Sequence, residues 1–354
     1  MNFASDNTAG MAPTIRDAIL RASEGHAPGY GADDGTGRLE RRFAELFEHE
    51  VGVFLVPTGT AANALAVAQL SPPWGAVLCH ADCHLATDEC GAAEFFGGGL
   101  KLIGLTGAAG KITAAALAEA LDCRPWGPPH HVTAAVLSLT QATEAGTVYR
   151  TGEVRELAAA AHARGLAVHM DGARFANALA RTNVTPAEAT WKAGVDALSF
   201  GATKGGALAA EAVILFDPAR AAGMAERRKR AGHLLSKHRF LAVQMEAFLD
   251  GDLWLTLARH ANAMADRLAA RLVAAGLTPI WPVEANELFV FLPRALDERL
   301  QAAGARYYPW STGSLPQTAG SGEAVLVRLV TSFATTAEEV DRFAAMVEAR
   351  PRAR

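Results

Sequence analysis

Two residues of complementary chemistry, Asp171 and Lys204, each follow a short apolar run. Residues 166–170 lead into Asp171, and residues 197–203 lead into Lys204. Runs of this length that alternate with helical stretches are typical of buried parallel strands. Because ligands bind at the carboxyl ends of such strands, we expect the carboxylate and the amine to face one crevice. An enzyme that uses pyridoxal 5'-phosphate (PLP) needs this pair: a lysine to form a Schiff base and an acid to pair with the ring nitrogen.

A candidate anion site lies at Thr58, Gly59 and Thr60, between a strand-like run and a helical stretch. Free backbone N–H groups and the dipole at a helix N-terminus favour an anion there. Glycine lets the backbone approach a ligand closely, and the two threonine hydroxyls add donors. The same pattern is also a good helix cap without any ligand. When it is considered together with Lys204 and Asp171, the pattern predicts a phosphate site.

Three further side chains are candidates for the same crevice. Arg174 comes three residues after Asp171 and is either its salt-bridge partner or a ligand of the cofactor or of a substrate carboxylate. Arg328 lies inside an apolar strand-like run, where its guanidinium fork favours a clamp on a carboxylate over an edge position facing water. His84 follows another strand end and is either an ordinary loop histidine or an imidazole stacked on the cofactor ring.

The overall charge and the lack of long apolar runs limit the kinds of binding partner that we expect. The chain of 354 residues has a net charge of −4, which gives no electrostatic case for nucleic acid. The short basic run 227–230 is predicted to be a solvated helix face, and Lys237 and Arg239 are better placed to help bind a phosphate. The N-terminal residues lack a basic start with an apolar core, and no apolar run approaches about 18 residues. We therefore expect a cytoplasmic protein without a membrane partner.

The four cysteines do not make a disulfide framework in a chain of this size. Cys79, His80, Cys83 and His84 form a cluster in which a metal is conceivable, and this alternative would suit a metal-dependent hydrolase. The spacing lacks a second Cys-x-x-Cys half. Reduced thiols at a strand end, with no metal, are therefore the prediction.

Strand-like and helical stretches alternate from about residue 38 to 216, which predicts an α/β fold with a mostly parallel sheet and helices on both faces. A long helical region over 224–274 follows, and shorter strand and helix patterns end the chain. Thr151 is a plausible N-cap, a capping box opens the last helix at Thr335, and 311–322 is predicted to be a flexible loop. The expected parts are an N-terminal arm over 1–20, a large cofactor-binding domain over 21–248 and a small α+β domain over 249–354.

Together these residues resemble the low-specificity L-threonine aldolases, which belong to the β-eliminating lyase group of the fold type I PLP-dependent enzymes. The resemblance runs through nearly the whole chain, and the Asp-Gly-Ala-Arg motif at 171–174 followed by Thr-Lys at 203–204 is its most specific part. It also takes in Ser5-Asp6-Asn7, Tyr30-Gly31-Ala32-Asp33, Pro57-Thr58-Gly59-Thr60, His84 with Glu89, Asn286 and Arg328. The stretch 138–144 departs from the pattern common in relatives, which leaves the contacts beside the ring open there.

The resemblance implies retro-aldol cleavage of L-threonine, L-allo-threonine and related β-hydroxy-α-amino acids to glycine and an aldehyde. It implies that Lys204 binds PLP covalently, that Asp171 pairs with the ring nitrogen and that His84 stacks on the ring. The phosphate would lie on Thr58, Gly59 and Thr60, and the substrate carboxylate would lie among Ser5, Arg174 and Arg328. A histidine is expected near the substrate hydroxyl as the general base, and the candidates are His84, His130 and His131.

The resemblance also implies a homotetramer, in which Tyr30 and the region of Lys237 and Arg239 reach a neighbouring subunit's site. β-Elimination or transamination of a small amino acid stays an alternative, because these reactions begin with the same covalent complex. A non-catalytic protein that keeps PLP as a structural ligand is a further alternative, although an intact lysine, acid and arginine speak against it. Threonine, allo-threonine and phenylserine differ only at Cβ. The pattern therefore predicts the class of β-hydroxy-α-amino acids and not one preferred member of it.

Overall fold

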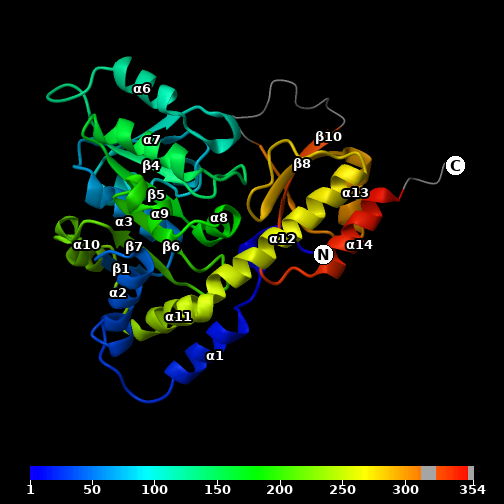
Figure 1. Ribbon diagram of the computed structural model, residues 1–354, viewed down its shortest axis with the longest axis horizontal. Coiled ribbons are helices and arrows are strands. Elements are labelled where there is room, and N and C mark those ends of the chain that lie inside the picture. Colours follow the sequence, from blue (N-terminus) through cyan, green and yellow to red (C-terminus); the bar gives the residue numbers. More distant parts are fainter. Residues whose placement is uncertain (312–323, 350–354) are drawn as a thin grey trace.

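The computed structural model describes residues 1–311 and 324–349, so the predicted loop over 311–322 lies, after Ser311, outside the described residues. Its larger part is built on a seven-stranded sheet in the order β1-β7-β6-β5-β4-β2-β3 (Figure 1). The strands are β1 (Gly52–Val56), β2 (Gly75–His80), β3 (Lys101–Leu105), β4 (Thr133–Thr140), β5 (Ala167–Gly172), β6 (Ala197–Gly201) and β7 (Glu211–Leu215).

All but one of these strands run in the same direction. β2 to β6 pair in parallel, whereas β7 runs antiparallel to both of its neighbours, β6 and β1. The carboxyl ends of six strands and the amino end of β7 therefore meet at one edge of the sheet. The predicted α/β class with a mostly parallel sheet is confirmed.

Helices cover both faces of this sheet because successive strand residues point to opposite sides. In β6, Leu198 and Phe200 join the larger core, whereas Ala197 joins a second core on the other face. The larger core packs against α2 (Asp34–Phe47), α6 (Ala114–Asp122), α7 (Thr151–His162) and α8 (Phe175–Thr182), and the second core packs against α3 (Gly59–Leu70) and α10 (Met224–Arg230). Residues 61–68 of α3 are all buried, as expected of a helix that is apolar on every side.

The smaller part is a three-stranded antiparallel sheet in the order β8-β10-β9, covered by helices (Figure 1). Its elements are β8 (Glu287–Pro293), α13 (Arg294–Ala302), β9 (Tyr308–Pro309), β10 (Ala324–Val330) and α14 (Ala337–Glu348). The predicted helical region over 224–274 is divided into α10, α11 (Arg239–Leu249) and α12 (Leu253–Ala274). In Figure 1, α12 runs from α11 to the small sheet and so connects the two parts.

The first residues of the expected N-terminal arm contact the small part. Phe3 donates its N–H to the carbonyl of Arg306 at 2.7 Å and accepts from the N–H of Val330 at 2.8 Å. Its ring is fully buried and packs edge-on against Phe343. The first long helix, α1 (Pro13–Ala22), begins inside the range expected for the arm.

Two predicted caps are wrong by one residue. Thr151 is the first residue of α7, and Arg150 is its N-cap. The last capping box joins Thr336 to Glu339, because the hydroxyl of Thr335 instead accepts from the N–H of Ser332. Every helix of the described ranges is too short or too polar to span a membrane.

Candidate active site

A cavity of about 490 Å³ lies at the sheet edge where the strand ends meet. Asp171 is the last residue but one of β5, and Lys204 lies just after the end of β6, so the carboxylate and the amine line one space as predicted. The remaining lining comes mainly from the loops after β1, β2 and β4 and includes Asn7, Thr58, Gly59, Thr60, Asn63, His84, Asp88, Glu89, Thr140, Ala142, Glu144, Ala173, Arg174, Thr203 and Glu211.

Asp171 is buried and fixed by two donors. Its Oδ1 accepts from the N–H of Ala173 at 3.0 Å, and its Oδ2 accepts from Nδ2 of Asn63 at 2.9 Å. The same amide of Asn63 also donates to Oε1 of Glu89 at 2.8 Å. We gave Asn63 no role from the sequence. The available signal is that a buried polar residue stands alone in an otherwise apolar helix, where it needs partners.

His84 and Glu89 form a hydrogen-bonded pair in the lining of the cavity. Nδ1 of His84 lies 2.9 Å from Oε1 of Glu89, whose side chain is fully buried, whereas the histidine side chain is 36% exposed. This hydrogen bond raises the pKa of His84, and burial raises the pKa of Glu89. With Nδ1 donating to the carboxylate, a neutral His84 keeps Nε2 as a free acceptor.

The N-terminus of α3 has the properties of an anion site. Thr58 caps the helix, since its Oγ1 accepts from the N–H of Ala61 at 3.1 Å. The N–H groups of Gly59 and Thr60 stand at the first two helical positions and have no acceptor within the helix. A Cβ built on Gly59 would have no atom within 4 Å, so there is open space over this first turn. The turn therefore suits a phosphate.

Glu211 is a further acid of the cavity that sequence reasoning missed. It opens β7 opposite Gly201 and is buried, and its Oε2 accepts from the N–H of Ala202 at 3.1 Å. Burial raises the pKa of Glu211 to about 7, although the nearby charge of Lys204 opposes the rise. The signal in the sequence is a single acid at the start of an apolar strand.

Arg174 pairs with Asp6 rather than with Asp171. Its Nε and Nη2 lie 2.8 and 3.2 Å from the two carboxylate oxygens of Asp6, and its Nη1 lies 3.4 Å from Oε1 of Glu287. Both carboxylates and the guanidinium are buried. Burial raises the pKa of Asp6, but the charges of Arg174 and Lys204 outweigh it, so that pKa falls below its ordinary value. Arg174 thus lines the cavity while its guanidinium is paired with the buried carboxylates of Asp6 and Glu287.

Two other predicted carboxylate ligands stand back from this cavity. Among the described residues that line it, neither Ser5 nor Arg328 is present. Ser5 caps a short 3-10 turn by accepting from the N–H of Asn7 at 3.1 Å, and Asn7 reaches the cavity instead. The guanidinium of Arg328 lies 4.4 Å from the centre of the Trp310 ring.

His130 and His131 lie at the wrong end of the sheet. Both are exposed and precede β4, whereas the cavity lies beyond the carboxyl end of that strand. The eight residues of β4 separate them from the cavity, which corresponds to about 26 Å of extended chain. The prediction that His130 or His131 is the general base is therefore wrong for the cavity of this chain. Of the three predicted candidates for the base, His84 alone lines that cavity.

Tyr30 and Lys237 are exposed, and Arg239 is half-buried. Tyr30 is 56% exposed, and its N–H donates to the carbonyl of Ser236 at 3.0 Å. Lys237 is exposed, and Arg239 is the first residue of α11. None of the three lines the cavity of its own chain in the part that the structure describes. Their assignment to a neighbouring subunit stays a prediction.

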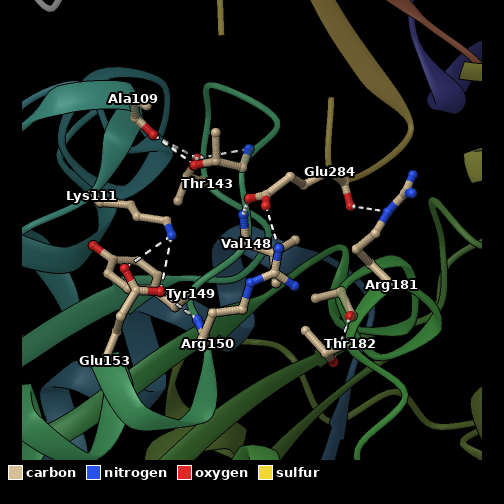
Figure 2. Close-up of polar contacts among 12 residues, drawn as sticks. Ala109, Lys111, Thr143, Val148, Tyr149, Arg150, Glu153, Arg181, Thr182 and Glu284 are labelled. Atoms are coloured by element: carbon tan, nitrogen blue, oxygen red, sulfur yellow. Dashed lines mark hydrogen bonds and ion pairs between the residues drawn. The ribbon is translucent and has the colours of Figure 1, made fainter. Parts of the chain in front are cut away.

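The departing stretch 138–144 includes the end of β4, and a polar network holds the loop that follows it (Figure 2). Glu284 accepts from the N–H of Val148 at 2.8 Å and pairs with the guanidinium of Arg150. The hydroxyls of Thr143 and Thr147 lie 2.8 Å apart, and Thr147 also donates to the carbonyl of Ala109 at 2.7 Å. This network fixes the loop that presents Ala142 and Glu144 to the cavity.

The cysteine and histidine cluster has a structural explanation. Cys79 is buried in β2, and Nε2 of His80 is 3.1 Å from the carbonyl of Gly107. Across residues 1–311 and 324–349, no group of three or more His, Cys, Asp and Glu side chains is arranged to hold a metal ion.

Comparison with known proteins places this fold and cavity in a family. The family model described as beta-eliminating lyase matches residues 2–295. A low specificity L-threonine aldolase of Pseudomonas aeruginosa is 44% identical over 308 residues, which cover 86% of this chain and 88% of that protein. One from a Pseudomonas species is 40% identical over 349 residues, covering 98% of this chain and 97% of that protein.

Solved structures agree with this assignment. A threonine aldolase structure from Leishmania major superimposes with a TM-score of 0.91 at 29% identity, covering 98% of both chains. A serine palmitoyltransferase from Sphingomonas wittichii, at 16% identity, shares the fold with a TM-score of 0.70 and covers 98% of this chain and 86% of that chain. The fold is therefore of the predicted type I class. The chain belongs to the beta-eliminating lyase family and is an enzyme of the lyase class.

Proposed function

We propose that this enzyme is a PLP-dependent threonine aldolase, which cleaves L-threonine and related β-hydroxy-α-amino acids into glycine and an aldehyde. The observation that carries the proposal is that Lys204, Asp171 and the open first turn of α3 line one cavity. The names of the Pseudomonas and Leishmania relatives support the same reaction.

The residues present fit PLP. The first turn of α3, with Thr58, Gly59 and Thr60, would hold the phosphate, and the buried Asp171 would pair with the ring nitrogen. Lys204 would supply the amine that joins the aldehyde carbon, and His84 would lie against the ring. When bound, PLP supplies the electron sink that accepts the electron pair of the broken Cα–Cβ bond.

The protein side chains then orient the substrate and move its protons. Asp171 would keep a proton on the ring nitrogen of the bound cofactor, and the donors Asn63 and Ala173 hold its carboxylate in place. Nε2 of His84 takes the proton of the substrate's β-hydroxyl, while Glu89 holds the imidazole at Nδ1. Such a proton transfer contributes about 10²–10⁴ in rate. Arg174 binds the substrate carboxylate, with Ser5 and Arg328 as the outer partners of this clamp.

The pH profile tests the role of His84. Glu89 raises the pKa of His84, so the change Glu89→Gln is expected to lower that pKa. A base must be neutral to accept a proton, so kcat/KM should rise with pH through the pKa of His84. In the variant this acidic limb should move to lower pH, as measured by initial rates of threonine cleavage between about pH 5 and 8. An acidic limb that stays in place or moves to higher pH would contradict this role.

Product analysis tests the reaction itself. The holoenzyme is incubated with L-threonine, L-allo-threonine and phenylserine, and in parallel with serine. We expect glycine together with acetaldehyde or benzaldehyde from the first three substrates. Pyruvate and ammonia from serine, without glycine release from threonine, would instead establish β-elimination and overturn the proposal.

We further propose that the enzyme is a homotetramer in which Tyr30, Lys237 and Arg239 serve a neighbouring subunit's cavity. The exposure of Tyr30 and Lys237, and the absence of all three residues from the described lining of their own cavity, support this arrangement. Mixing Lys204→Ala subunits with Arg239→Ala subunits should then restore activity that neither variant has alone. Light scattering that gives the mass of one chain, with no restoration on mixing, would contradict it.

A further inference from the structure

Glu287 is a buried carboxylate behind Arg174 for which the proposed mechanism has no use. It opens β8, its side chain is fully buried, and neither of its oxygens has a hydrogen-bond partner among the described residues. Its nearest cationic atom is Nη1 of Arg174 at 3.4 Å. A Cβ built on Gly146 would lie 3.0 Å from Cγ of Glu287, so Gly146 packs closely against the Glu287 side chain. A buried carboxylate without donors is costly and calls for an explanation.

The second arginine of the proposed clamp lies on the same sheet face. In the antiparallel pair of β8 and β10, Glu287 stands opposite Val330, and Arg328 stands opposite Phe289. Arg328 is therefore the diagonal neighbour of Glu287 on one face, within reach of a long side chain. Glu287 thus interacts electrostatically with both arginines that the proposed function assigns to the substrate carboxylate.

The charges around Glu287 leave little capacity for another anion. The charged groups that face it are Arg174, Arg328, Glu144 and Asp6. With Glu287 itself, this group has two cations and three carboxylates, and Asp6, which Lys204 also stabilises, occupies two donors of Arg174. Burial raises the pKa of Glu287, even though both arginines oppose the rise. A substrate carboxylate on Arg174 would add a fourth anion and raise this pKa further.

We propose that Glu287 takes up a proton when the substrate carboxylate binds, which ends its competition for Nη1 of Arg174. Glu287 is then a positioning residue that acts through the arginine clamp, and the inference rests on the proposed function for the identity of that carboxylate. Linkage fixes the sign: where free Glu287 is ionised, binding consumes a proton, so affinity falls as pH rises. The fall is at most about tenfold per pH unit for one proton.

The test measures binding apart from turnover. The probe is 3-hydroxybutyrate, which has the carboxylate and β-hydroxyl of threonine but lacks the amine that would react with the cofactor. Isothermal titration of the holoenzyme in two buffers of different ionisation enthalpy, across a pH series, gives affinity and proton uptake together. The variants are Glu287→Gln and Glu287→Met, which keep the side-chain length without a titrating group, and the matched control is Glu298→Gln on the exposed side of α13.

We expect the wild type and the control to take up about one proton more than either Glu287 variant, and to lose affinity more steeply with rising pH. Protons that titrate at His84 or at the cofactor are common to all four proteins and cancel in this difference. Equal proton uptake in all four, no proton uptake by the wild type, or no binding of 3-hydroxybutyrate to the wild type would each overturn the inference. Threonine cleavage by the same wild-type preparation tests the proposed function separately.

Discussion

Replacing Lys204 by alanine is expected to abolish threonine cleavage, with turnover lower by at least about 10⁴-fold. The variant loses the amine that joins the cofactor and that substrate displaces, and the surrounding lining of the cavity offers no second lysine. The measurement is glycine release from L-threonine by the purified variant with excess PLP.

Lys192→Ala is the matched control, because Lys192 pairs with Glu48 on the surface at 2.7 Å, far from the strand ends that form the cavity. Exposed pairs of this kind contribute at most about 1 kcal/mol to stability. The control should therefore keep wild-type turnover. A Lys204→Ala protein that cleaves threonine within tenfold of the wild type would refute the assignment of the nucleophile.

Asp171→Asn is expected to lower turnover by about 10²–10³-fold while leaving the fold intact. Asparagine keeps the size and one acceptor oxygen of the side chain but removes the charge that would hold a proton on the ring nitrogen. Its NH2 group also faces a donor, from Asn63 or from Ala173, so the variant loses one buried hydrogen bond, which should cost about 1–3 kcal/mol of stability. Kinetics with L-threonine at saturating PLP measure the effect, and circular dichroism checks the fold.

Asp196→Asn tests the same chemical change at the opposite edge of the sheet. Asp196 precedes β6 and accepts from the N–H of Val168 at 2.7 Å and from His162. Its loss should lower the free energy of unfolding by about 1 kcal/mol and leave turnover of the folded protein unchanged. Equal losses of turnover in the two asparagine variants would contradict a specific role for Asp171.

The sheet and its active edge could be predicted because their signals are local. Short apolar runs that end in Asp171 and Lys204 reveal buried strands, and parallel strands present their carboxyl ends at one edge. Thr58 and Gly59 likewise reveal a helix start within a few residues. Each of these inferences needs only a segment and a rule of strand or helix geometry.

The polar partners within the site could not be predicted in the same way. Asp6 and Arg174 are 168 residues apart, and Asn286 joins them from a further part of the chain. Nothing in the local pattern of Arg174 distinguishes Asp6 from Asp171 as its partner. The failure for His130 and His131 has a different origin, because their place before β4 already puts them at the amino end of a strand.

The central claim is that Lys204 carries the cofactor, and reduction of the holoenzyme with borohydride tests it most directly. Reduction makes the lysine–PLP bond permanent, and digestion followed by mass spectrometry identifies the modified residue. We predict one pyridoxyl group per chain, on the peptide that contains Lys204, and none on the Lys204→Ala protein. A chain that binds no PLP, or that carries the label on a different lysine, would contradict the account.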